Sequence, residues 1–166
     1  MARTPSYVER VPSTGIFAIL LTVAALTGGA ALAQAWIGPL GSDPAPTWFY
    51  AGFSALFAGL AATFRRVDVR LDRHGIEVAY GIVRRRLAWR DVDAVERDDR
   101  PAFYGYGVRF GRSRGRWVWV INVIGAPCVA VLTRRHGPAS LVFSTRRPDE
   151  VVAVARQYLA QRTRRT

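Results

Sequence analysis

The hydrophobic pattern of the chain changes once, near residue 65, from long apolar runs to short alternating ones. No charged residue lies between Arg10 and Asp43, and none lies between Asp43 and Arg65. Because a helix that crosses a bilayer needs about 20 mostly apolar residues, the pattern predicts two membrane-spanning helices, over about 15–37 and about 47–64. A short loop rich in Gly and Pro joins them, so we expect a helical hairpin.

The flanks of the two segments predict their orientation. Trp36 and Trp48 stand at the loop-side ends, where aromatic rings favour the bilayer interface. Arg10 precedes the first segment, and Arg65 and Arg66 follow the second, whereas the loop has no cation. Since arginine is enriched on cytoplasmic flanks, we expect a multi-pass protein of the inner cell membrane with both termini in the cytoplasm.

Neither segment contains an ionisable residue, which indicates an anchor rather than a transporter or channel. Small residues recur at four-residue spacing and favour close packing of the hairpin on itself or on a second copy. They are Ala25, Gly29 and Ala33 in the first segment and Ala51, Ala55 and Gly59 in the second. Alternatively, Ala31-Leu32-Ala33 resembles a signal-peptidase site. Cleavage there would leave a single span.

Beyond residue 65, apolar and polar residues alternate in short runs, which predicts β-strands. The expected strands lie at 67–72, 76–80, 82–87, 106–110, 117–123, 128–132 and 139–143, and the stretch 89–98 is either a further strand or a short irregular turn that enters one. The last segment predicts an amphipathic helix, because Pro148 suits a first turn and Asp149 and Glu150 complement the helix dipole. About seven short strands followed by one helix imply a curved antiparallel sheet or barrel that the helix plugs.

Several motifs of this region, in their order and spacing, resemble the bacterial pleckstrin-homology-like (PH-like) domain in its membrane-anchored form. They are LDRHGIEV (71–78), LAWRDV (87–92), YGYGVR (104–109), VIGA (123–126), the strand at 128–132 and TRRPDE (145–150). The resemblance implies a seven-stranded antiparallel barrel capped by a C-terminal helix, in a family whose biochemical role is mostly undefined. The stretch 117–121 departs from the pattern through its aromatic and branched residues, and suggests a longer strand or a contact surface.

The expected organisation has four parts. An N-terminal tail (1–14) precedes the membrane hairpin (15–64), and the PH-like domain (65–161) is followed by a basic tail (162–166).

Composition adds a strong positive charge to the second half of the chain. The formal net charge is +12, all 24 basic residues are arginine, and all but Arg3 and Arg10 lie at or after Arg65. A basic domain beside a bilayer experiences the anionic lipid surface. The candidate lipid- or anion-binding residues are Arg65, Arg66, Arg84, Arg85 and Arg86, with Arg112 and Arg114 in a Gly/Arg/Ser loop expected at 111–115. The alternative is a solvated face that serves solubility.

No residue pattern indicates catalysis, a metal or another cofactor. The single cysteine, Cys128, lies in an apolar run, and His74 and His136 lie in expected turns. The one acidic cluster is interpreted as solvated charge, and comprises Asp91, Asp93, Asp98 and Asp99. Arginine interleaved with aromatics at 103–110 could stack on nucleic-acid bases, but alternating aromatics in strands are usually core, so a nucleic-acid partner is disfavoured.

Two functional hypotheses follow. The first is a non-catalytic, membrane-anchored PH-like domain that acts as a scaffold and binds another protein or a second copy of itself. The second is a sensor of anionic lipid head groups that uses the arginine-rich face. Electrostatic lipid binding should weaken steeply with salt, whereas capture of a protein segment through apolar contacts should not.

Overall fold

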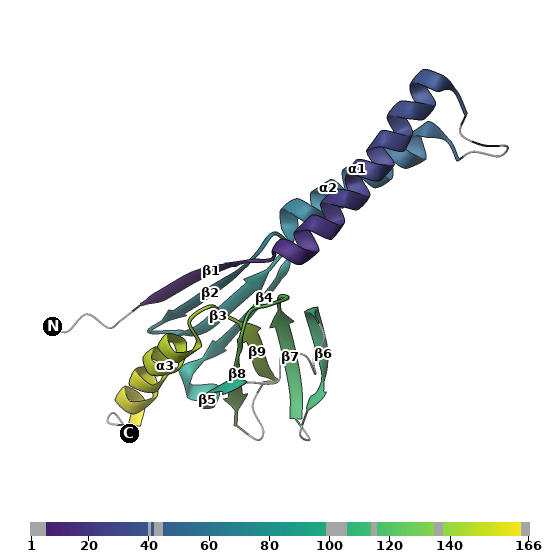
Figure 1. The fold of residues 1–166 in the computed structure, drawn as a ribbon. Coiled ribbons are helices and arrows are strands. Elements are labelled where there is room, and N and C mark those ends of the chain that lie inside the picture. Colours follow the sequence, from purple (N-terminus) through teal and green to yellow (C-terminus); the bar gives the residue numbers. More distant parts are fainter. Residues whose placement is uncertain are drawn as a thin grey trace. The chain divides into compact units, whose positions relative to one another are not determined.

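A computed structural model describes residues 6–39, 41, 45–98, 106–113, 116–134 and 138–163 (Figure 1). The chain divides into two compact units. The helical unit is Ser13–Arg65, and the β unit consists of Met1–Pro12 and Arg66–Thr166.

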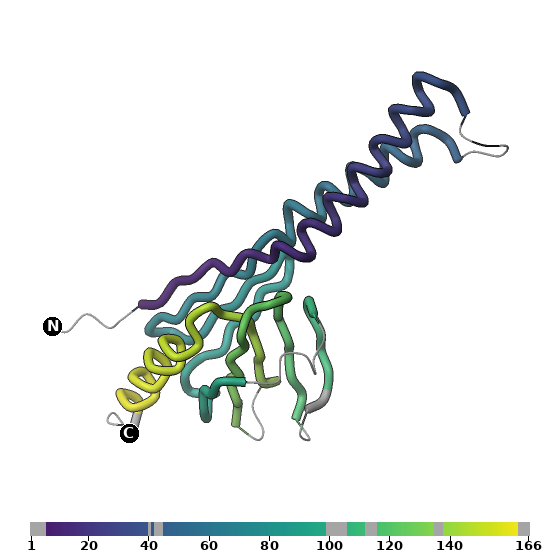
Figure 2. Tube along the Cα trace, in the orientation of Figure 1, coloured from purple at the N-terminus to yellow at the C-terminus, as the bar shows by residue number. Residues whose placement is uncertain are grey.

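The helical unit contains α1 (Thr14–Ile37) and α2 (Thr47–Thr63), which pack side by side (Figures 1 and 2). Ser54 Oγ of α2 donates a hydrogen bond to the Ala24 carbonyl of α1 at 2.8 Å. A Cβ on Gly28 would lie 2.8 Å from that same hydroxyl oxygen, so the small residue permits the close approach.

The prediction of a two-span hairpin is wrong. Among the described residues, α1 alone is long and apolar enough to cross a membrane. Only 11% of its apolar stretch is buried in the structure. α2 begins after Pro46 and ends before Phe64. Its 17 residues are too few for it to be identified as a second membrane-spanning helix. The sequence pattern marked both segments as apolar, but it overestimated the length of the second helix.

The first sheet of the β unit has four antiparallel strands in the order β1-β2-β3-β4. These are β1 (Tyr7–Pro12), β2 (Arg66–Asp72), β3 (Gly75–Tyr80) and β4 (Val83–Ala88). β1 lies in the stretch predicted as an N-terminal tail, and it pairs with β2 from Tyr7–Leu71 to Pro12–Arg66. The strand that precedes the helical unit thus pairs with the strand that follows it.

The second sheet has five strands in the order β5-β8-β9-β7-β6. These are β5 (Val92–Asp98), β6 (Gly107–Ser113), β7 (Arg116–Asn122), β8 (Cys128–Thr133) and β9 (Ser140–Ser144). A 3-10 turn, η1 (Trp89–Asp91), leads into β5, and helix α3 (Pro148–Thr163) ends the described chain. α3 confirms the predicted C-terminal helix.

The predicted seven-stranded antiparallel barrel is also wrong. The described residues form nine strands in two separate sheets, and β7 pairs with β9 in parallel. Alternation along the chain located most of the strands, but it carries no information on which strands pair. It therefore missed both the insertion of β9 between β7 and β8 and the addition of β1 to the first sheet.

The two sheets pack on each other through alternate residues of their strands. Val69 and Val78 of the first sheet and Val129 and Phe143 of the second are fully buried. Arg85 of β4 stacks on the ring of Trp119 of β7, with its guanidinium carbon 3.8 Å from the ring centroid, which marks the facing sides of the sheets.

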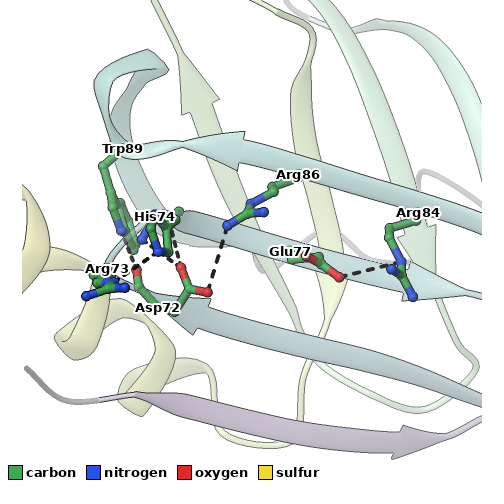
Figure 3. Close-up of polar contacts among 8 residues, drawn as sticks. Asp72, Arg73, His74, Glu77, Arg84, Arg86 and Trp89 are labelled. Carbon is green, nitrogen blue, oxygen red and sulfur yellow. Dashed lines mark hydrogen bonds and ion pairs between the residues drawn. The ribbon is translucent and has the colours of Figure 1, made fainter.

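A tight turn joins β2 to β3 and sets the register of the first sheet (Figure 3). The Asp72 carboxylate accepts hydrogen bonds from the backbone N–H groups of His74 and Gly75, at 2.7 and 3.1 Å. Gly75 has φ 153°, and a Cβ there would lie 2.0 Å from the Leu87 carbonyl oxygen, so the position requires glycine.

Candidate functional site

Helix α3 covers one part of the β unit, beside η1 and β5; we name this part the closed edge. α3 contacts η1, β2, β5 and β8. The ring of Trp89 stacks on Tyr158 of α3 at a centroid distance of 4.8 Å. Arg162 of α3 donates hydrogen bonds to the carbonyl oxygens of Trp89 and Val92, at 2.7 and 3.0 Å. Trp89 is consequently only 7% exposed.

A buried carboxylate lies on the same edge, beside a shallow cavity of about 570 Å³. Glu9 of β1 accepts hydrogen bonds from the hydroxyls of Tyr7 and Thr145 and, at 2.9 Å, from the backbone N–H of Arg146. Burial, reinforced by the neighbouring Glu9 carboxylate, raises the pKa of Tyr7 to about 12. We name these four residues the Glu9 network. Because three donors occupy the carboxylate, the network ties β1 to the segment before α3 rather than serving as a general base.

Away from α3, the strands β6 and β7 expose aromatic side chains next to β4; we name this region the open edge. The rings of Phe110 and Trp117 stack at 4.9 Å with an interplanar angle of 5°, and Phe110 also contacts Trp119 at 4.8 Å. Phe110 is 51% and Trp117 is 56% exposed. We name these three rings the aromatic cluster. The guanidinium group of Arg85 lies over the ring of Trp119.

On the side of the second sheet that faces the first sheet, the exposure of the side chains rises from the middle strands to the open edge. Val131 in β8 and Leu141 in β9 are buried, whereas Trp119 in β7 is half-buried and Phe110 in β6 is exposed. A cavity of about 160 Å³ lies where the first sheet stops covering the second sheet. Its lining residues are Arg85, Arg86, Leu87, Trp119, Pro138, Ala139 and Leu141. The first sheet therefore leaves the outer strands of the second sheet uncovered on this side.

The three consecutive arginines of β4 separate to two sides of the first sheet. Arg84 and Arg86 share the outer side with their cross-strand neighbours on β3, and pair with carboxylates there (Figure 3). The Nε of Arg84 lies 3.5 Å from Glu77 Oε1, and an Nη of Arg86 lies 3.9 Å from Asp72 Oδ2. Arg85 points to the facing side, over Trp119. The structure thus does not bring the three guanidinium groups together.

The other arginines singled out in the sequence lie elsewhere. The backbone carbonyl of Arg65 accepts a hydrogen bond from the Ser13 N–H at 2.8 Å, within the helical unit. Arg66 lies in β2, with its Nε 3.4 Å from Asp68 Oδ2. Arg112 belongs to β6 opposite Trp117 rather than to a loop, and Arg114 lies outside the described residues.

The remaining chemistry-bearing residues do not form a site within the described part of the chain. Cys128 is buried in β8, and burial raises the pKa of its thiol. His74 lies in the exposed turn after β2. No group of three or more His, Cys, Asp or Glu among the described residues could hold a metal ion. Asp99 and His136 lie outside the described residues, as do Phe103 and Tyr104.

Sequence reasoning missed the exposure of the aromatic cluster. Aromatics at alternate positions of a strand normally indicate a core, and the pattern at 106–110 was interpreted that way. The available signal was the unusual richness of 117–121 in aromatic and branched residues, which had suggested a contact surface.

No protein-family model, no curated protein and no solved structure matches this chain. The resemblance to PH-like domains therefore stays a prediction.

Proposed function

We propose that this protein is a non-catalytic protein-interaction module that is anchored in the inner membrane and contacts its partner through the open edge on the cytoplasmic side. The observation that carries the proposal is the exposed, stacked aromatic cluster with Arg85 over one of its rings. Tryptophan and arginine dominate the energetics of protein interfaces, and a contiguous exposed aromatic patch is unusual on a surface that faces only water.

Anchoring is supported by the exposed apolar surface of α1. Ile19, Leu26 and Leu32 are each at least 60% exposed, a surface that water disfavours and a bilayer accepts. The β unit carries every arginine of the chain except Arg65, and arginine-rich flanks favour the cytoplasm.

The charge of the β unit favours an acidic protein as the partner. The helical unit holds only Asp43 and Arg65, whose charges cancel, so the whole formal net charge of +12 belongs to the β unit. The arginines on the outer side of the first sheet lie beside carboxylates, since Arg10 and Arg66 both contact Asp68 and Arg84 contacts Glu77. This pairing makes lipid sensing the weaker hypothesis.

The test is photocrosslinking in intact cells, with a photoreactive phenylalanine analogue at Trp117 of the full chain. The matched control carries the same group at Val8 of β1, which is 57% exposed on the outer side. A protein adduct of defined mass from position 117, absent from position 8, is the expected result. Labelling of lipid alone from position 117, or equal adducts from both positions, would overturn the proposal.

A further inference from the structure

We propose that the open edge receives its partner as an added β-strand: an extended acidic peptide segment pairs with β4 and becomes the fifth strand of the first sheet. This inference rests on the proposed function and specifies the chemistry of its partner.

The backbone of β4 is available for pairing on one side. β4 is the last strand of the first sheet, and among the described residues no strand pairs with it on the side away from β3. The N–H and C=O groups on such an edge form a template for an incoming strand.

β4 lies beside the uncovered aromatic cluster, since Arg85 lies over Trp119. The uncovered rings of Phe110 and Trp117 belong to β6 and β7. A strand added beside β4 would lie over Phe110 and Trp117 and would remove them from water. A lipid head group or a free anion would not supply that cover.

The arginines of β4 specify the sequence of the added strand. Arg84 and Arg86 are on the outer side, and each guanidinium contacts one carboxylate of the first sheet. Since a guanidinium carries five N–H donors, each can also bind a carboxylate on a neighbouring strand. Residues of the added strand that point to the facing side would meet Trp119, Leu87 and the cavity of about 160 Å³. Acidic and apolar residues should therefore alternate along the partner segment.

A second copy of this chain fits the same edge poorly. Pairing of β4 with β4 would place arginine opposite arginine, and like charges on directly opposed strand residues repel each other. Edge arginines can instead serve only to prevent aggregation. Failure of the parent peptide to bind in the test below would favour that role.

The experiment measures fluorescence anisotropy of a labelled peptide, Glu-Val-Glu-Phe-Glu-Val-Glu, with the full chain in nanodiscs of neutral lipid. Two N-methylated peptides of the same sequence and charge each lack the N–H donors along one edge of the strand. Pairing with β4 uses one peptide edge, so we expect one N-methylated peptide to bind at least tenfold more weakly and the other to bind normally. Equal binding of all three, or no binding of the parent peptide, would overturn the strand proposal.

Protein variants locate the bound strand. R84A/R86A should weaken binding at least tenfold. R10A/R70A removes the same charge from β1 and β2 on the same outer side, distant in the strand order from β4, and should bind as the unaltered chain does. Equal weakening by both pairs would show a general electrostatic attraction instead. If the peptide fails to bind while position 117 still yields a protein adduct in cells, the strand mode is wrong and the proposed function stands.

Discussion

The two edges of the β unit use the same pair of side-chain types with opposite outcomes. At the closed edge, Trp89 stacks on Tyr158 and Arg162 binds the adjoining carbonyls, all under α3. At the open edge, Phe110 stacks on Trp117 while both rings remain half in water. Stacked rings and an arginine therefore do not by themselves define a core.

The difference indicates where a covering element is present and where one is missing. At the closed edge the chain supplies that element itself, and Arg162 ties α3 to the backbone carbonyls of Trp89 and Val92. At the open edge Arg85 is stacked on Trp119, and the neighbouring edge of β4 has no strand partner within the described residues. The comparison predicts that substitutions at the closed edge lower stability, whereas those at the open edge affect binding.

The largest expected effect is that of Trp89→Ala. Removal of a buried, stacked indole that also donates to the Asp72 carbonyl should lower the free energy of unfolding by about 3–5 kcal/mol. The matched substitution Trp117→Ala, of an exposed indole, should lower it by less than about 1 kcal/mol. Urea unfolding of the full chain in detergent, followed by far-ultraviolet circular dichroism, measures both. Similar losses for the two variants would contradict the distinction between the edges.

The next effect in size is that of Glu9→Gln. The amide keeps the shape of the side chain but replaces one acceptor oxygen with a donor, which leaves part of the Glu9 network mismatched. The free energy of unfolding should fall by about 1–3 kcal/mol. Glu96→Gln on the exposed side of β5 is the control and should leave the unfolding midpoint unchanged. An unchanged midpoint for Glu9→Gln would mean that the network does not hold β1 in place.

The contrast between the edges also explains what the sequence could predict. Alternation located β2 and β3, and the Pro148, Asp149 and Glu150 signals located α3, because these features are local in the chain. Two of the three partners of Glu9, Thr145 and Arg146, lie 136 and 137 residues away, so no local pattern marks it as a network residue.

The exposure of Phe110 and Trp117 depends on how far the first sheet extends over the second. That extent arises from strand pairing and not from any single stretch of residues. The arginine alternation at β4, by contrast, was foreseeable, since consecutive residues of a strand point to opposite sides.

A smaller, pH-dependent effect should arise from Tyr7. A tyrosine of the unfolded chain ionises near pH 10, whereas Tyr7 in the folded chain has a pKa of about 12. Between these values the unfolded chain releases a proton that the folded chain keeps. The contribution of Tyr7 is therefore complete below pH 10 and is lost as the pH rises to 12. Tyr7→Phe should show a shallower loss of stability across this window in urea unfolding, and an equal slope would contradict the assignment.

The smallest expected effect is that of Arg85→Ala at the open edge. A partly exposed cation over an indole contributes about 0.5–1 kcal/mol, so the free energy of unfolding should change by no more than that. The emission of Trp119 should nevertheless change, because its ring loses the guanidinium and gains contact with water. Fluorescence of the variant in a Trp117→Phe background, compared with Arg84→Ala in the same background, measures the change, since Arg84 lies on the outer side. A stability loss as large as that of Trp89→Ala would mean that Arg85 closes this edge as Arg162 closes the other, and that no place for a partner strand remains.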